Sequence, residues 1–131
     1  MTVWIVDAMN VIGSRPTGWW RDRPAAVDRL RGATRRLVAA THEPVTLVVD
    51  GRPPPGLPRD EDAGVRVEYA SRAGANAADD RIAELVASDP APADVRVVTS
   101  DRALQERVRE LGARVVSARE WLRRLDAPAE P

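Results

Sequence analysis

Acidic residues follow three of the short apolar runs in the sequence, close to the point where each run ends. These residues are Asp7, Asp50 and Asp101, and a further pair, Asp79 and Asp80, opens a helical segment. One such Asp is often only the N-cap of the next helix, and Asp101 suits that role. The whole set is harder to explain by capping, because a helix needs one cap and clustered carboxylates are costly to bury without a cation. We therefore expect these acids to bind a divalent cation.

The available ligand types narrow the choice of metal. The sequence contains no Cys and a single His, His42, which excludes thiolate zinc sites and sites built from several histidines. Carboxylate oxygens suit Mg²⁺ or Mn²⁺, ions that also bind substrate phosphates. Two ions about 4 Å apart can hold the attacking water and the leaving oxygen of a phosphodiester. The pattern therefore indicates phosphoryl chemistry assisted by one or two such ions.

Alternating apolar runs and helical segments predict the scaffold that positions these acids. The predicted strands are 3–6, 45–49, 65–69, 95–98 and 115–116, and the predicted helices are 25–41, 77–88, 102–111 and 118–125. Segments 13–24 and 52–64 are predicted loops, and 65–69 alternates as a half-exposed edge strand does. The alternation favours a mostly parallel sheet with helices on both faces. Ligands bind beyond the carboxyl ends of such strands, which is where the acids fall.

Length and composition limit the class of protein. With 131 residues the chain is expected to form one domain over residues 1–125, followed by a frayed tail, 126–131. Its 20 acidic and 20 basic residues balance, which weakens a DNA-coating role without excluding a nuclease. All the basic residues are Arg, so classes that require an active-site Lys, such as phosphate-loop NTPases, do not fit. Neither a signal peptide nor a membrane span is recognisable, so we expect a cytoplasmic protein with no membrane partner.

Four short motifs, found in order along the chain, resemble those of the NYN domain. They are Val6–Ile12 (VDAMNVI), Val48–Gly51 (VVDG), Ala78–Ile82 (ADDRI) and Val98–Arg102 (VTSDR). The resemblance is nearest to the YacP-like ribonucleases of the PIN-like and flap-endonuclease-like superfamily, and it covers nearly the whole chain. It implies a three-layer α/β/α PIN-like (Rossmann-like) sandwich whose five strands lie in the order 3-2-1-4-5. It also implies metal-dependent hydrolysis of RNA.

Matched position by position, the resemblance implies roles for individual residues. Asn10 matches an asparagine that orients the substrate or a metal-bound water. Asp50 matches a metal-site acid whose role is less constant among the flap-endonuclease relatives. Those relatives often have Glu where this chain has Ala77, so a single ion is an alternative to two. The remaining implied metal ligands are Asp7, Asp79, Asp80 and Asp101.

Polar side chains near the acids are candidates for substrate binding. Arg72 and Asn76 belong to a segment that is either a phosphate-binding loop or an ordinary turn in which Asn76 caps the helix. Arg15 in the first loop and Arg102 after the last acid are expected on the metal side, where they would contact phosphate. Further loop arginines would complete a basic rim: Arg21, Arg23, Arg52 and Arg59. 

The first predicted loop also carries an aromatic pair. Trp19 and Trp20 could stack on unpaired bases or plug the loop onto the body of the domain, and we favour a plug for at least one of them.

The leading hypothesis is a metal-dependent ribonuclease that acts endonucleolytically on RNA. The alternative is a non-catalytic RNA- or ribosome-binding module with a degenerate nuclease site. A small-molecule phosphatase is disfavoured, because the chain lacks the lysine that such enzymes use. Both a monomer and a homodimer are compatible with the sequence.

Overall fold

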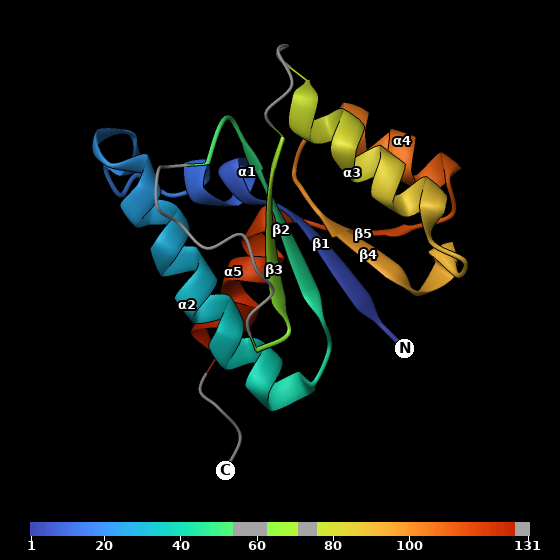
Figure 1. Ribbon diagram of the computed structural model, residues 1–131, viewed down its shortest axis with the longest axis horizontal. Helices are drawn as coiled ribbons and strands as arrows, with labels where there is room; N and C mark the ends of the chain where they lie inside the picture. The colour runs from blue at the N-terminus through green and yellow to red at the C-terminus, as the bar shows by residue number, and fades with distance from the viewer. Residues whose placement is uncertain (54–62, 71–75, 128–131) are drawn as a thin grey trace.

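A single parallel sheet lies between two layers of helices in the computed structural model (Figure 1). The structure describes residues 1–53, 63–70 and 76–127, so the predicted phosphate contacts at Arg59 and Arg72 lie outside the described residues. The strands are β1 (Val3–Asp7), β2 (Val45–Asp50), β3 (Val65–Ala70), β4 (Val95–Val98) and β5 (Arg114–Val116). Their order is β3-β2-β1-β4-β5 and all four pairings are parallel, which confirms the predicted fold.

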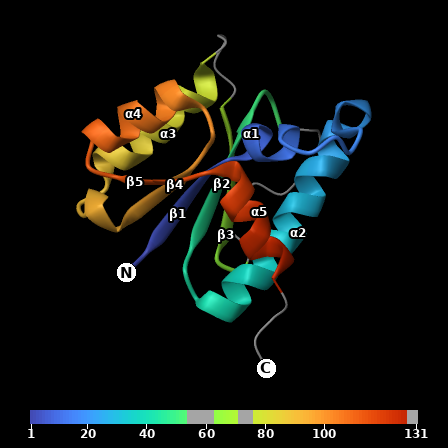
Figure 2. The same cartoon turned by 180° about the vertical axis from the view of Figure 1, so that it is seen from behind.

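The helices divide between the two faces of the sheet. One layer holds α3 (Ala77–Ser88) and α4 (Arg102–Glu110), as the view from behind in Figure 2 also shows. The other layer holds α1 (Ala8–Gly13), α2 (Arg23–Thr41) and α5 (Ala118–Asp126). Short 3₁₀ turns, η1 (Trp19–Arg21) and η2 (Pro92–Asp94), interrupt two of the connections.

Alternation along β1 supplies one hydrophobic core to each layer. Trp4 and Val6 belong to the core beneath α1, α2 and α5, whereas Ile5 belongs to the core beneath α3 and α4. Trp4 packs on Trp121 of α5 with ring centroids 5.1 Å apart, and both indoles are buried. Since successive strand residues point to opposite faces, Asp7 follows Ile5 onto the α3–α4 face.

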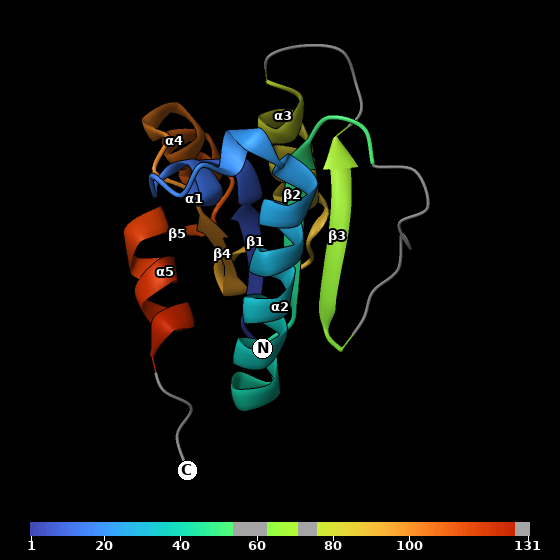
Figure 3. The same cartoon turned by 90° about the vertical axis from the view of Figure 1, so that its left-hand side faces the viewer.

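One element of the fold was not predicted, and the predicted edge strand is confirmed. Helix α1 was not predicted, because six residues are too few to show a helical period. Segment 65–69 was predicted as an edge strand, and β3 does lie at the edge of the sheet. Figure 3 shows that α1 and the beginning of α2 lie at the end of the sheet to which the arrow of β3 points. That end carries the predicted site residues.

None of the helices in the described ranges is both long enough and apolar enough to cross a membrane.

Candidate metal centre

Asp7 is the buried acid of the site. It ends β1 with 7% of its surface exposed, and its Oδ2 accepts a hydrogen bond of 3.0 Å from the hydroxyl of Thr99. Burial raises the pKa of Asp7 from 3.8 to about 6, against the lowering effect of the Thr99 hydrogen bond. The negative charges of Asp79 and Asp50 raise this pKa further. Asp7 therefore sits in a dry, negatively charged environment that favours a cation.

Asp79 belongs to the same electrostatic cluster. Partial burial is the largest cause that raises the pKa of Asp79. The charges of Asp101 and Asp50 raise this pKa further, while the charge of Arg107 lowers it. The charge of Asp50 therefore acts on both Asp7 and Asp79, and the charges of Asp101 and Asp80 act on Asp79. The structure brings Asp7, Asp50, Asp79 and Asp101 to one end of the sheet, on its α3–α4 face.

Two of these carboxylates also hold the beginnings of helices. Asp101 is the N-cap of α4, and its Oδ1 accepts from the backbone N–H of Leu104 at 3.1 Å. Asp50 reaches from the end of β2 to α3, where its Oδ1 accepts from the N–H of Ala78 at 3.3 Å. Asn76 stands at the N-cap position of α3, but its side chain makes no cap hydrogen bond there. Of the two alternatives for Asn76, a cap through its side chain is not formed, and Asp50 supplies the acceptor from another strand.

Asp80, next to Asp79 in the chain, is paired with α4. Its Oδ1 accepts a hydrogen bond of 2.8 Å from Arg107, and both side chains are close to half exposed. This ion pair joins α3 to α4. Arg107 was not predicted as part of the site, since it lies 27 positions from Asp80 and no local pattern links the two residues.

Polar groups around the β4–α4 turn fix the position of the acids. The Oδ1 of Asn10 on α1 accepts from the N–H of Ser100 at 2.8 Å. The hydroxyl of Thr99, which is fully buried, donates to Asp7 and accepts from the N–H of Asp101 at 3.1 Å. Sequence analysis missed Thr99, although a hydroxyl between a buried strand and a capping Asp is a usable signal. Thr99 connects the two acids through one side chain.

The predicted phosphate-binding arginines are not gathered at the cluster. Arg15 forms an ion pair with Asp126 at the end of α5, in the other helix layer. Arg102 begins α4 beside Asp101 and is exposed. Of the two, Arg102 is the one placed next to the acids.

The donor chemistry of the cluster fits a hard divalent cation, because its charged ligands are all carboxylates. Within the described ranges, however, no three acidic or histidine side chains lie close enough together to hold one ion. Part of the reason is visible in the contacts: Asp50 and Asp101 are turned to helix N–H groups, and Asp80 to Arg107. Ala77 is buried in the core under α3 and adds no carboxylate.

Comparison with known proteins assigns this α/β/α sandwich, with its acids at the carboxyl ends of the central strands, to a family. The family model described as the YacP-like NYN domain matches residues 4–130. A crystal structure of Rae1 (YacP) from Bacillus subtilis superimposes with a TM-score of 0.74 at 30% identity, covering 96% of this chain and 74% of that one. A mutant of the same protein gives a TM-score of 0.76 at 27% identity, with 96% and 76% covered.

The search of curated proteins returned no match. The extent of the family match and the identity to Rae1 (YacP) are nevertheless decisive. The chain belongs to the YacP-like NYN domain family, as its four motifs indicated.

Proposed function

We propose that this protein is a metal-dependent ribonuclease that hydrolyses phosphodiester bonds within RNA. The observation that carries the proposal is the buried Asp7, whose pKa is raised to about 6 next to Asp79 and Asp50. Burying one carboxylate among others destabilises a fold unless a cation compensates for the charge. Membership of the NYN domain family supports RNA as the substrate.

The residues would divide the work as follows. Asp7 and Asp79 would hold the ion, joined by Asp50 and Asp101 once these turn from their helix N–H groups. A bound Mg²⁺ or Mn²⁺ supplies an acidified water and balances charge on the phosphate. Asn10 keeps the turn before Asp101 in place through its hydrogen bond to the Ser100 N–H.

Two further residues take supporting roles. Arg102, which is exposed beside Asp101, would contact a substrate phosphate. Asp80 would hold α3 against α4 through Arg107 and join the ion only if that ion pair opened.

A non-catalytic RNA-binding module is the second candidate. It is favoured by two observations: Ala77 offers no carboxylate, and three of the acids are engaged by protein donors. This candidate predicts RNA binding that EDTA leaves unchanged, with no turnover. A ribonuclease predicts the opposite on both counts.

The deciding experiment measures cleavage of a labelled single-stranded RNA with added Mn²⁺ or Mg²⁺. We expect Asp7→Asn and Asp79→Asn each to reduce cleavage by more than about 100-fold, beyond the loss usual for an outer-sphere partner. Asp28→Asn, an exposed change on α2, is the matched control and should leave the rate unchanged. Mn²⁺ binding measured by calorimetry should weaken in the same two variants.

Cleavage that survives both substitutions and EDTA would refute the metal mechanism. Tight RNA binding without Mn²⁺ affinity or turnover would establish the binding module instead.

A further inference from the structure

A hollow lies at the carboxyl end of β2, on the face of the sheet opposite Asp7 and Asp79. It encloses about 190 Å³ and is bordered by the ends of β2 and β3, by α1 and by the start of α2. Its lining includes Met9, two residues after Asp7, and Asp50, whose Oδ1 is bonded to α3. The hollow therefore adjoins the candidate metal centre across the carboxyl end of one strand.

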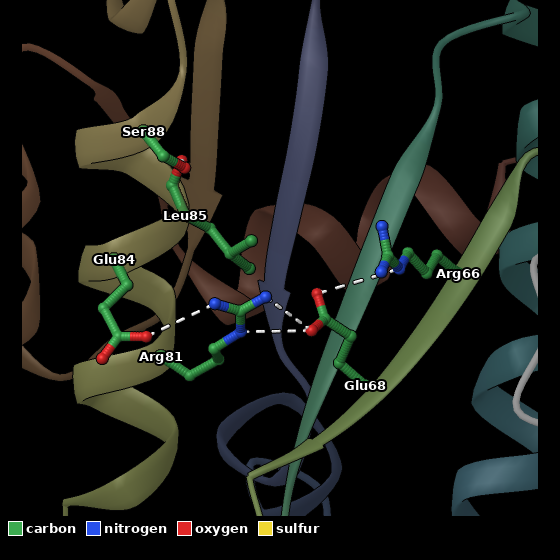
Figure 4. A network of polar contacts seen from close by, with 6 residues as sticks. All are labelled: Arg66, Glu68, Arg81, Glu84, Leu85 and Ser88. Carbon is green, nitrogen blue, oxygen red and sulfur yellow. Dashed lines mark hydrogen bonds and ion pairs between the residues drawn. The ribbon is translucent and has the colours of Figure 1, made fainter.

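The walls of this hollow, here called the β2–β3 pocket, are apolar and partly aromatic. Met9, Val27, Val49 and Tyr69 all line it. Tyr69 faces this side because its neighbour Glu68 points the other way, bonding Arg81 of α3 at 2.8 Å, as Figure 4 shows. The phenol of Tyr69 is protonated at neutral pH and can donate a hydrogen bond, and burial raises its pKa further. An aromatic ring, a thioether and two valines form a surface suited to a flat ring.

The charges at this pocket are complementary to a nucleotide. Arg23 and Arg52 contribute to its lining and both are exposed. Asp50, the one acid among the described residues of the lining, directs Oδ1 to the N–H of Ala78 on the opposite face. An apolar lining with two arginines at its edge matches a base with an attached phosphate.

The size of the pocket indicates one ring system rather than a large ligand. A cavity of about 150 Å³ is enough to bind benzene, whereas drug-sized ligands occupy roughly 300–1,000 Å³. We propose that the β2–β3 pocket takes one unpaired nucleobase of the RNA strand, flanking the bond that is cut. This proposal rests on the proposed ribonuclease function. A strand crossing the end of β2 would then carry a phosphate over the acids and an adjoining base into the pocket.

The first test does not depend on cleavage. Nucleoside 5′-monophosphates are titrated into ¹⁵N-labelled protein in EDTA, and backbone amide shifts are followed by NMR. We expect the shifts to concentrate at Met9, Gly51, Arg52 and Tyr69, and to disappear in Tyr69→Leu. Arg119→Gln, an exposed change on α5, is the control and should bind as the wild type does. Shifts that are absent, or that gather elsewhere, overturn the proposal.

A second variant tests the pocket independently in case Tyr69→Leu does not fold. Arg52 is exposed, so Arg52→Gln should keep the fold. It should weaken binding of the monophosphates but not of the corresponding nucleosides. Equal loss for both ligands, or no loss for either, contradicts the assigned role of Arg52.

The second test uses cleavage of RNAs that carry one abasic position at a time. Stacking of a base on an aromatic side chain is worth 1–3 kcal/mol, or roughly 5- to 150-fold. We expect kcat/KM to fall by that factor at one position fixed relative to the cut, and Tyr69→Leu to lose this sensitivity. If cleavage requires Asp7 but is unaffected by an abasic site at every position, the base pocket is refuted and the ribonuclease function stands. If NMR shows base binding but no RNA is cleaved, the ribonuclease function is refuted and the base pocket stands.

Discussion

Replacing Asp7 by Asn removes a charge that the fold buries, and this change should stabilise the metal-free protein. The pKa of Asp7 is about 6 in the folded chain against 3.8 for a free carboxyl. The difference corresponds to about 3 kcal/mol at 1.36 kcal/mol per pH unit. Asn keeps the shape of the side chain, and its carbonyl can still accept from Thr99. We therefore expect Asp7→Asn to gain up to about 3 kcal/mol in free energy of unfolding at pH 7.5.

The sign of the pH dependence follows from proton linkage. Because the folded pKa lies above the unfolded one, the wild type loses stability as the pH rises from 3.8 to about 6. Above that window the penalty is complete and constant. At pH 4 the advantage of Asp7→Asn should shrink to less than about 1 kcal/mol.

Urea unfolding in EDTA at pH 7.5 and pH 4 measures both quantities. With an m-value of about 1–3 kcal/mol/M, a gain of 3 kcal/mol moves the midpoint by roughly 1–3 M. Asp28→Asn, which changes an exposed charge, should move it little at either pH. The reasoning is refuted if Asp7→Asn is no more stable than the wild type at pH 7.5, or equally stabilised at pH 4. Added Mn²⁺ should stabilise the wild type by mass action and Asp7→Asn much less.

Three further predictions concern single positions. Thr99→Val leaves Asp7 and the N–H of Asp101 without their shared partner, so urea unfolding should show a loss of about 1–3 kcal/mol. Trp20 is 58% exposed, so Trp20→Ala should leave the unfolding midpoint nearly unchanged. If this indole stacks on RNA, the Kd for single-stranded RNA, measured by fluorescence anisotropy, should rise by at least roughly 5-fold. Ala77→Glu places a carboxylate in the core under α3, so it should lower the melting temperature rather than increase Mn²⁺ stoichiometry, as circular dichroism and calorimetry would show.

The elements of the fold were predictable because most of them carry a clear apolar pattern. The run 45–49 and the helical spacing of 77–88 correspond closely to β2 and α3. The order of the strands came from the resemblance to the NYN domain, since periodicity alone does not say which strands pair. Helix α1 escaped prediction because its six residues show no repeat and most of its contacts are with distant segments.

The candidate site was predictable in its positions but not in its contacts. Parallel strands bring their carboxyl ends together, so Asp7, Asp50 and Asp101 had to share one end of the sheet. Which donor each carboxylate finds depends on side chains far away in the chain. Arg15 pairs with Asp126, which lies 111 positions away in the chain, and no local pattern predicts that pairing. The difference between a ligand and a helix cap is therefore decided by tertiary packing.

The stacking of Trp4 on Trp121 has a consequence for folding during synthesis. Trp4 lies in the first strand and Trp121 in the last helix, and Arg124 of that helix covers the Trp4 ring at 4.9 Å. Trp121 is added 117 residues after Trp4, which at 5–20 residues per second takes a ribosome roughly 6 to 23 s. Through that interval the central strand lacks part of its cover, and one indole is without its partner. The apolar surface of β1 on this face is therefore covered in full only after α5 has been made.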